Sequence, residues 1–313
     1  MCTIYPDYYP RFSCIASRCT HNCCIGWEID IDPDTLRRYQ AEEGPMGQRL
    51  ARSISAGEDP HFLLGEGERC PFLNQENLCD LILYKGEGFL CQICTDHPRF
   101  RTFLPNRAEV GLGLCCEEAA RLILSQEKPV TLCGEAAGAP EPDAQALLDL
   151  REQLFALAQD RSQPIKDREQ AILARCQTSL PDLTAAQWAE IYLNLERLNP
   201  AWTAILEDLR DHGEEADPAA FNRFMTGRET EYEQLLVYFL YRHFLTAYED
   251  GDPGGKAAFA VLSTRLLRRL GARRWQRTGQ FSLEDQAEYA RLYSSEVEYS
   301  QENLDALFDL LMG

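Results

Sequence analysis

Residues 14–24 read CIASRCTHNCC, which places four cysteines and one histidine within eleven positions. Working outward from this stretch, three further groups follow: Cys70 and Cys79, Cys91 and Cys94, and Cys115 and Cys116. The chain has 13 cysteines in 313 residues, and none lies in the last 137 positions. The cysteines therefore divide the sequence into a cysteine-rich front and a cysteine-poor back.

The clustered thiols predict a metal site rather than a set of disulfides. The start of the chain, MCTIYPDYYPRF, has neither the basic nor the apolar part of a secretory signal, so we expect a cytoplasmic protein with reduced thiols. Thiolates are soft ligands that favour zinc, copper(I) and iron–sulfur clusters. A zinc ribbon would need two Cys-x2-Cys pairs, and only Cys91 and Cys94 form one. We favour an iron–sulfur cluster of the 4Fe-4S type, with zinc as the alternative.

Not every cysteine is interpreted as a ligand. Cys2, Cys133 and Cys176 stand alone, and a single free cysteine usually behaves as a small buried hydrophobe. His21 and His97 lie among the cysteines and are interpreted as polar residues that have found a hydrogen-bond partner.

The back of the chain predicts helix after helix, because apolar residues recur at helical spacing between turns marked by Pro and Gly. The expected helices are residues 141–160, 164–177, 182–197, 200–212, 217–226, 229–249, 254–271, 282–296 and 300–312. In the front we expect a short strand at 27–31, a helix that begins near Asp32-Pro33, a loop at 52–67 and a helix from Cys116 onward.

The fold class that follows is mainly α. An irregular, cysteine-rich, metal-binding domain is expected at residues 1–133 and an all-helical domain at residues 134–313. The stretch CGEAAGAPEPD at 133–143 is interpreted as the linker between them.

The charge of the chain excludes some classes of partner. Asp and Glu number 50 against 31 Lys and Arg, for a formal net charge of −19. Nucleic acids and anionic membrane surfaces attract basic proteins, so neither is an expected partner. The longest conspicuous apolar run, Leu235–Tyr241, is far shorter than the about 20 residues that cross a bilayer. The acidic balance fits basic partners or simply solubility.

Several motifs in this order resemble the flagellin lysine-N-methylase family. They are residues 12–14 (FSC), 19–32 (CTHNCCIGWEIDID), 70–73 (CPFL), 91–94 (CQIC), 97–99 (HPR), 112–121 (LGLCCEEAAR), 238–244 (YFLYRHF) and 293–304 (YSSEVEYSQENL). In the 112–121 segment the family has Ser where this chain has Cys115 and Pro where it has Glu117, so Cys116 is the matching cysteine. The front alone is also similar to cysteine-cluster domains described as zinc- or iron-chelating.

The resemblance implies an enzyme that transfers a methyl group from S-adenosylmethionine to surface lysines of flagellin and contains a cysteine-ligated metal centre. The metal ligands predicted on this basis are Cys14, Cys19, Cys23, Cys70, Cys79, Cys91, Cys94 and Cys116. The predicted catalytic residues are Tyr293, Glu296 and Tyr238, and those predicted to bind the methyl donor are Arg99, Arg242 and Asn303.

The chemistry limits how such an enzyme could work. The acceptor lysine must lose a proton before its amine attacks the methyl carbon, so a carboxylate or tyrosine is needed near it. Glu296, Ser300 and Asn303 share one face if a regular helix runs through them. No Gly-rich turn lies in a strand–helix unit, so we expect a donor site outside the doubly wound fold. Cys19 and Cys23 are followed by Gly26, which excludes the Cys-x3-Cys-x2-Cys signature of radical chemistry.

A second hypothesis stays open at this point. The chain could instead be a metal-binding module without catalytic activity, with a metal-bearing front and a helical back that docks a protein partner.

Overall fold

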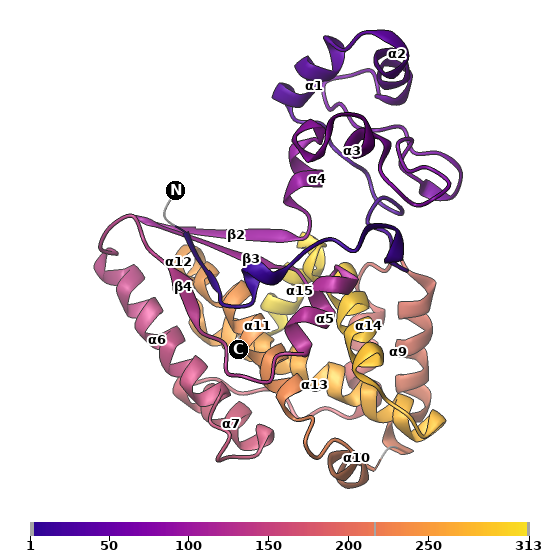
Figure 1. Ribbon diagram of the computed structural model, residues 1–313. Coiled ribbons are helices and arrows are strands. Elements are labelled where there is room, and N and C mark those ends of the chain that lie inside the picture. The colour runs from indigo at the N-terminus through magenta and orange to yellow at the C-terminus, as the bar shows by residue number, and fades with distance from the viewer. Residues whose placement is uncertain (1–2, 216, 312–313) are drawn as a thin grey trace. The chain divides into compact units, whose positions relative to one another are not determined.

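The computed structural model describes residues 3–215 and 217–311, and its contacts divide the chain into two units (Figure 1). The cysteine-rich unit is Ser13–Arg99, and the helical unit combines the residues up to Phe12 with those from Phe100 onward. This division differs from the predicted boundary at residue 133. The reason is that Leu104, Leu112 and Ile123 are buried in the core of the helical unit, although they precede the predicted linker.

The cysteine-rich unit consists of short helices joined by loops. They are α1 (Pro33–Gln40), α2 (Gly44–Ser53), α3 (Asp80–Lys85) and α4 (Gln92–Asp96), with 3₁₀ turns at Ala16–Arg18, Glu66–Glu68 and Glu87–Phe89. The predicted helix start is confirmed, because Asp32 accepts a hydrogen bond from the amide of Thr35 at 2.9 Å and Pro33 occupies the first helical position. The strand expected at 27–31 is wrong: only isolated bridges form nearby, such as Asp30 with His61.

A cluster of aromatic rings forms the core of this unit. Tyr39 stacks on Phe62, whose ring centroid lies 5.0 Å from that of Phe72, and Tyr39 also meets Phe89 at 5.1 Å. Each of these side chains is buried. Pairs of aromatic rings at such distances add to the free energy of apolar burial.

The helical unit carries a four-stranded sheet that the sequence did not predict. Its strands are β1 (Thr3–Pro6), β2 (Arg99–Leu104), β3 (Arg107–Leu112) and β4 (Leu132–Gly134), in the order β2-β3-β1-β4. β1 pairs parallel to β3, with Ile4 opposite Glu109, and antiparallel to β4. The expected linker therefore begins inside β4, at Cys133.

The helix predicted from Cys116 onward and those of the back are found in order, with shifts at their ends, except that the one expected at 229–249 is divided into α11 and α12 by a 3₁₀ turn at Phe244–Thr246, so the chain is mainly α. They are α5 (Glu117–Leu124), α6 (Pro142–Ala158), α7 (Ile165–Arg175), α8 (Ala185–Leu193), α9 (Pro200–His212), α10 (Pro218–Phe224), α11 (Thr230–His243), α12 (Ala247–Asp250), α13 (Pro253–Thr278), α14 (Leu283–Tyr293) and α15 (Gln301–Leu311). In the described part of the chain, no helix is long and apolar enough to cross a membrane.

Two helices are buried on nearly every side, which is why the others pack around them. α11 is buried from Glu231 to Tyr241, and α13 is buried from Gly255 to Thr264. The two helices contact one another, and Figure 1 shows them in the middle of the helical unit. A helix that is apolar around its whole circumference is typical of the centre of a larger domain.

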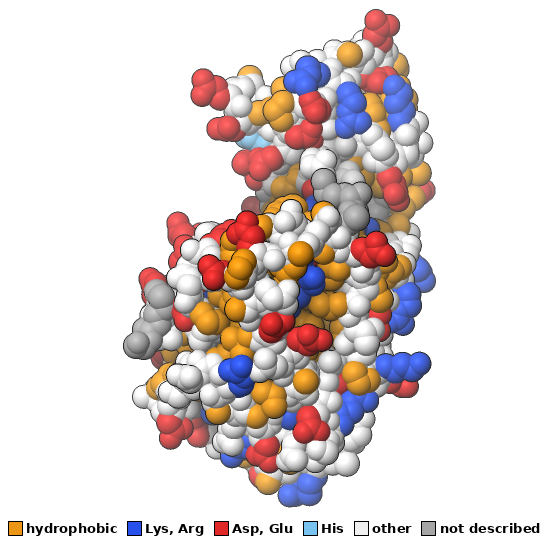
Figure 2. Space-filling view, turned by 90° about the vertical axis from the view of Figure 1, so that its left-hand side faces the viewer, with side chains coloured by type: hydrophobic (Ala, Val, Ile, Leu, Met, Phe, Trp, Pro, Cys, Tyr) orange, Lys and Arg blue, Asp and Glu red, His pale blue; other side chains and the backbone are white. Residues whose placement is uncertain are grey.

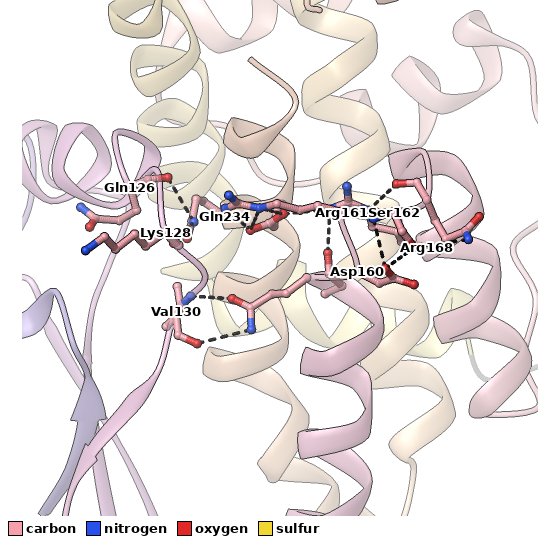
Figure 3. Close-up of polar contacts among 12 residues, drawn as sticks. Gln126, Lys128, Val130, Asp160, Arg161, Ser162, Arg168 and Gln234 are labelled. Atoms are coloured by element: carbon pink, nitrogen blue, oxygen red, sulfur yellow. Dashed lines mark hydrogen bonds and ion pairs between the residues drawn. The ribbon is translucent and has the colours of Figure 1, made fainter. Parts of the chain in front are cut away.

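Polar side chains of α11 bind two neighbouring segments, the region around α7 and the loop that follows α5 (Figure 3). The fully buried Glu233 carboxylate binds Arg161 and Arg168, each at 2.8 Å. The next residue, Gln234, donates to the backbone carbonyls of Gln126 at 3.3 Å and Lys128 at 3.1 Å. The loop between α5 and β4 is therefore held in a single position against α11.

The surface of the protein mixes the two charges. On the face shown in Figure 2, acidic and basic side chains are interspersed with hydrophobic ones, and no large patch of a single sign covers it. The acidic excess of the chain is thus spread over that face rather than concentrated at one point.

A buried ion pair connects the sheet to α6. Arg151 makes two hydrogen bonds to Glu109 of β3, at 2.7 and 2.8 Å, and both side chains are at most 3% exposed. Glu109 also accepts a hydrogen bond from Arg107 Nε at 2.6 Å, so removing Arg151 leaves the buried carboxylate with one guanidinium partner instead of two. Losing one of two charged partners of a buried group costs about 1–3 kcal/mol.

We predict that Arg151→Met lowers the free energy of unfolding by about 1–3 kcal/mol in urea titrations followed by circular dichroism, because Glu109 keeps its pair with Arg107. The matched control is Arg121→Met, which removes an exposed pair with Glu118 and should cost less than about 1 kcal/mol. Equal losses for the two variants would contradict the assignment of Arg151 as a structural ion-pair partner.

Candidate functional site

Three of the motifs singled out in the sequence meet in the helical unit. The hydroxyl of Tyr238, on α11, accepts a hydrogen bond from the backbone amide of Leu114 at 3.2 Å. The same hydroxyl donates to the carboxylate of Glu298 at 2.9 Å. One side chain thus connects residues 112–121, 238–244 and 293–304, which are far apart in the sequence.

Glu298 is the centre of this cluster, which we call the Glu298 network and define as Glu298, Tyr238, Arg242 and His243. The carboxylate is fully buried, and its Oε1 lies 3.2 Å from Arg242 Nε and 2.7 Å from His243 Nε2. Arg242 also donates to the hydroxyl of Tyr238 at 3.0 Å. Charged and neutral partners together satisfy the buried carboxylate.

The surroundings set the charges of these four groups. Burial alone would raise the pKa of the Glu298 carboxyl, but Arg242 and His243 outweigh it and hold that pKa below its ordinary value. Burial lowers the pKa of His243, although Glu298 opposes the change. Burial raises the pKa of Tyr238. Near neutral pH the network therefore holds one carboxylate and one guanidinium, with a neutral phenol and a neutral imidazole.

A π-helix places Glu298 where these partners can reach it. The helix expected at 282–296 ends at Tyr293, and the wider π-helical turn Ser294–Glu298 follows it. Such turns are rare and are frequent at functional sites. Without the extra residue, Glu298 would point in a different direction around the helix axis.

The outer side of the network reaches the surface at Tyr299. The Arg242 guanidinium lies 4.8 Å from the centroid of the Tyr299 ring and 5.0 Å from that of Phe100, and Tyr299 is 50% exposed. The neighbouring Cys115 is hydrogen-bonded to Tyr299, yet burial raises the pKa of its thiol to about 12. Cys115 is therefore a protonated thiol and not a reactive thiolate.

The structure places the other predicted residues of this region in packing contacts. Tyr293 is fully buried, and its hydroxyl lies 2.7 Å from that of Ser263. The Glu296 carboxylate accepts the backbone amides of Leu198 and Asn199, at 2.8 and 3.0 Å. Tyr293 therefore connects to α13, and Glu296 fixes the backbone just before α9, so both side chains have structural contacts.

The expected helical face of Glu296, Ser300 and Asn303 does not form on one helix. The π-helical turn ends at Glu298, and Ser300 precedes the first residue of α15. Asn303 nevertheless lies next to Glu296, because its amide donates to the Glu296 carbonyl at 2.7 Å and to the Glu196 carbonyl at 2.9 Å. This side chain holds the loop before α9 against the π-helical turn.

The structure brings together Tyr238 and Arg242 but not the full predicted set. Arg99 belongs to the cysteine-rich unit, where it donates to the carbonyl of Thr95 at 3.2 Å. Sequence reasoning did not select Glu298, the residue that organises the cluster, although it lies within a quoted motif. The segment YSSEVEYS does contain Glu298, two positions after Glu296. In a regular helix, however, these two glutamates would lie on different faces, so the spacing rule that selected Glu296 passed over Glu298.

The predicted metal ligands are divided between the two units. The helical unit contains Cys116, at the start of α5, and the cysteine-rich unit contains the rest. Cys14 is exposed and Cys19 is half-buried, both near the start of that unit. Cys23 is exposed as well, whereas the remaining four are buried or half-buried in the core of that unit, together with Cys24, which was not among the predicted ligands.

Six thiols in and beside that core influence one another, of which Cys23 is the exposed one. We call them the core thiols: Cys23, Cys24, Cys70, Cys79, Cys91 and Cys94. Burial raises the pKa of Cys70 to about 11, and the nearby Cys79 and Cys91 add to the rise. The hydrogen bond that Cys94 donates to Cys91 raises the pKa of Cys94 and lowers that of Cys91. The thiols are close enough for their charges to interact.

The arrangement of the core thiols is not that of a formed metal site. All twelve cysteines of the described chain are free. Among the described residues, no group of three or more His, Cys, Asp and Glu side chains has a metal-binding arrangement. The chemistry of six soft donors in one core fits a thiophilic metal, whereas their positions in the structure do not yet enclose one.

Comparison with known proteins identifies the helical part of the chain. Residues 180–312 match the family model of the FliB lysine N-methylase C-terminal domain. The lysine-N-methylase of Salmonella typhimurium is 28% identical over 134 residues, which cover 41% of this chain and 33% of that protein. The flagellar biosynthetic protein FliU of Salmonella muenchen is 27% identical over 134 residues, which cover 41% of this chain and 79% of that protein.

These matches confirm the resemblance to the lysine-N-methylase family. The matched region spans about a third of the lysine-N-methylase it was compared with, and it contains all four residues of the Glu298 network. No solved structure matches the chain.

The Glu298 network predicts a pH dependence of stability. The pKa of His243 is lower in the folded protein than its ordinary value of 6.5. As the pH falls below about 6.5, the unfolded chain therefore takes up a proton that folded His243 does not, and stability is lost by at most about 1.4 kcal/mol per pH unit. The loss continues until the pH reaches the folded pKa.

We predict that the stability advantage of the wild type over His243→Gln shrinks between pH 7 and pH 5, as measured by urea unfolding at each pH. His212→Gln, at an exposed site, is the control and should track the wild type. A pH-independent difference between wild type and His243→Gln would show that His243 is not held neutral by burial.

Proposed function

We propose, from the membership of residues 180–312 in the lysine-N-methylase family, that this protein transfers methyl groups from S-adenosylmethionine to lysines of flagellin. The family match is the observation that carries the proposal. The printed names of the relatives support it further, since two are called lysine-N-methylase and one is called a flagellar biosynthetic protein.

The charge of the chain supports a lysine-bearing protein as the acceptor. A net charge of −19 attracts basic segments at long range and accelerates their encounter with the protein. The interspersed charges in Figure 2 do not favour one docking point over another on that face. The net charge therefore speeds the approach of a basic acceptor, whereas local contacts must set the orientation in which it binds.

The Glu298 network supports this reaction by positioning rather than by exchanging protons. Its carboxylate already binds Arg242, His243 and Tyr238, so it has little capacity left for an incoming group. Instead, the network positions the residues at its surface end: Arg242 lies against the ring of Tyr299, and Tyr299 is hydrogen-bonded to Cys115. Methyl transfer depends mainly on alignment of donor, methyl group and amine, for which a rigid frame is the main requirement.

We further propose that the core thiols bind an iron–sulfur cluster, with zinc as the alternative. Four thiolates complete either kind of site, and the core offers six. A bound metal would stabilise the cysteine-rich unit, whose helices are short, because metal binding by thiolates adds directly to the free energy of folding. Cys70 and Cys91 are the best-placed ligands, since both are buried among the other thiols.

The alternative of a metal-binding module without catalysis keeps one specific observation in its favour. Tyr293 and Glu296, two of the three residues predicted to be catalytic, are engaged in hydrogen bonds within the protein and are not directed toward a substrate. An assay of methyl transfer separates the two functions.

We predict that the purified protein, prepared without oxygen, incorporates label from methyl-labelled S-adenosylmethionine into lysines of flagellin, as detected by mass spectrometry. Flagellin with chemically blocked lysines is the control and should gain no label. Absence of incorporation from protein with its full metal content would favour the non-catalytic module.

We also predict that Cys70→Ser and Cys91→Ser lose most of the bound metal in elemental analysis, because both thiols lie in the core. Cys133→Ser and Cys176→Ser are matched controls outside that unit and should retain it. Brown protein would identify iron–sulfur and colourless protein zinc; unchanged metal content in the first two variants would refute the ligand assignment.

A further inference from the structure

A separate cavity of about 210 Å³ lies between α9, α13 and α14, within the matched residues 180–312. Its apolar wall includes Ala204, Ile205 and Leu270, and its polar wall includes Asp208, Arg273 and Arg277. None of these residues belongs to the Glu298 network or to the site residues predicted from the sequence. The cavity therefore calls for an interpretation of its own.

The charges in this cavity are unevenly balanced. Arg273 makes two hydrogen bonds to the Asp208 carboxylate, at 3.0 Å from Nε and 2.9 Å from Nη2. Both carboxylate oxygens are engaged by this pair. Arg277 shares the same carboxylate only at 3.7 Å, beyond hydrogen-bond distance, and its side chain is 52% exposed. Among the residues that line the cavity, two guanidinium groups thus accompany one carboxylate, so the charged lining is positive on balance.

The guanidinium of Arg277 can form directed hydrogen bonds to a ligand. A guanidinium presents several N–H donors in a plane, and it pairs best with a carboxylate through two parallel hydrogen bonds. Within the part of the chain that the structure describes, the ion pair of Arg277 is the 3.7 Å contact with a carboxylate that Arg273 already holds. An external carboxylate could therefore pair with Arg277 without displacing an existing hydrogen bond.

The apolar wall defines the rest of the ligand. Small-molecule sites are typically apolar surfaces with a few polar groups that set orientation. A cavity of about 150 Å³ accepts benzene, so this cavity has room for a compact body of similar or slightly larger size. Ala204 is exposed and small, which leaves the space beside the half-buried Ile205 open, while the buried Leu270 forms the base of the cavity.

We propose that this cavity binds a carboxylate carried on a short apolar chain, with Arg277 pairing with the carboxylate and Ala204, Ile205 and Leu270 contacting the chain. Two sources offer a carboxylate on a short chain: a small free carboxylic acid, and the methionine end of the methyl donor, which also carries an α-ammonium and a sulfonium. Only the second source rests on the proposed function. In that case the adenosine part would extend out of the cavity, which is too small for the whole molecule.

The experiment is isothermal titration calorimetry of the full-length protein with butyrate, S-adenosylhomocysteine and methylthioadenosine, which lacks the amino-acid end. Arg277→Gln removes the charge, and Ala204→Leu fills the cavity from an exposed position. Arg223→Gln on α10 and Ala306→Leu on α15 are the matched controls, because both residues are exposed and lie outside the cavity.

The expected result is a loss of affinity of roughly tenfold or more in both cavity variants and none in the controls. If this loss affects S-adenosylhomocysteine while methylthioadenosine is unchanged, the ligand is the donor's methionine end. If it affects butyrate alone, the ligand is a free acid. Failure of butyrate and S-adenosylhomocysteine to bind, or equal affinity in wild type and both cavity variants, overturns the proposal. Methyl transfer to flagellin that persists in that case would leave the proposed function intact.

Discussion

The buried carboxylate of Glu298 is the constraint around which the helical unit is organised. A carboxylate removed from water costs several kcal/mol unless charged and hydrogen-bonded partners compensate it. Arg242, His243 and Tyr238 supply that compensation from one turn of α11. Because Tyr238 also holds the amide of Leu114, the end of the sheet and the start of α5 depend on the same carboxylate. Few other arrangements of these segments would satisfy all of the groups at once.

The two units are stabilised by different means. The helical unit buries α11 and α13 almost completely, so apolar packing accounts for most of its stability. The cysteine-rich unit has short helices around a small aromatic core, beside which the core thiols lie. A unit of this kind commonly relies on a bound metal for part of its stability. Oxygen-free handling would then matter for the folding of that unit as well as for activity.

The similarity to lysine-N-methylases concerns the helical part, and that part contains two distinct polar sites. The Glu298 network is closed, with its charges neutralised inside the protein. The cavity beside Arg277 is open and has a charge that the protein only partly neutralises. The first is suited to maintaining structure, whereas the second is the cavity for which a ligand is proposed.

The sequence by itself determined the features that depend on neighbouring residues. Helical spacing located the helices of the back, Asp32 and Pro33 marked the start of α1, and the cysteine groups separated a thiol-rich front from a helical back. Only the tertiary structure decided the features that depend on distant residues. β1 pairs with β3 across about a hundred residues, which no local pattern records, and this pairing draws residues 100–133 into the helical unit. A regular helix was expected through Glu296, but the π-helical turn shifted the side chains after it and brought Glu298 to Arg242. The physical reason is the same in both cases: periodicity reports which face of an element is buried, whereas the partner that meets that face is chosen by packing and by the need to neutralise buried charge.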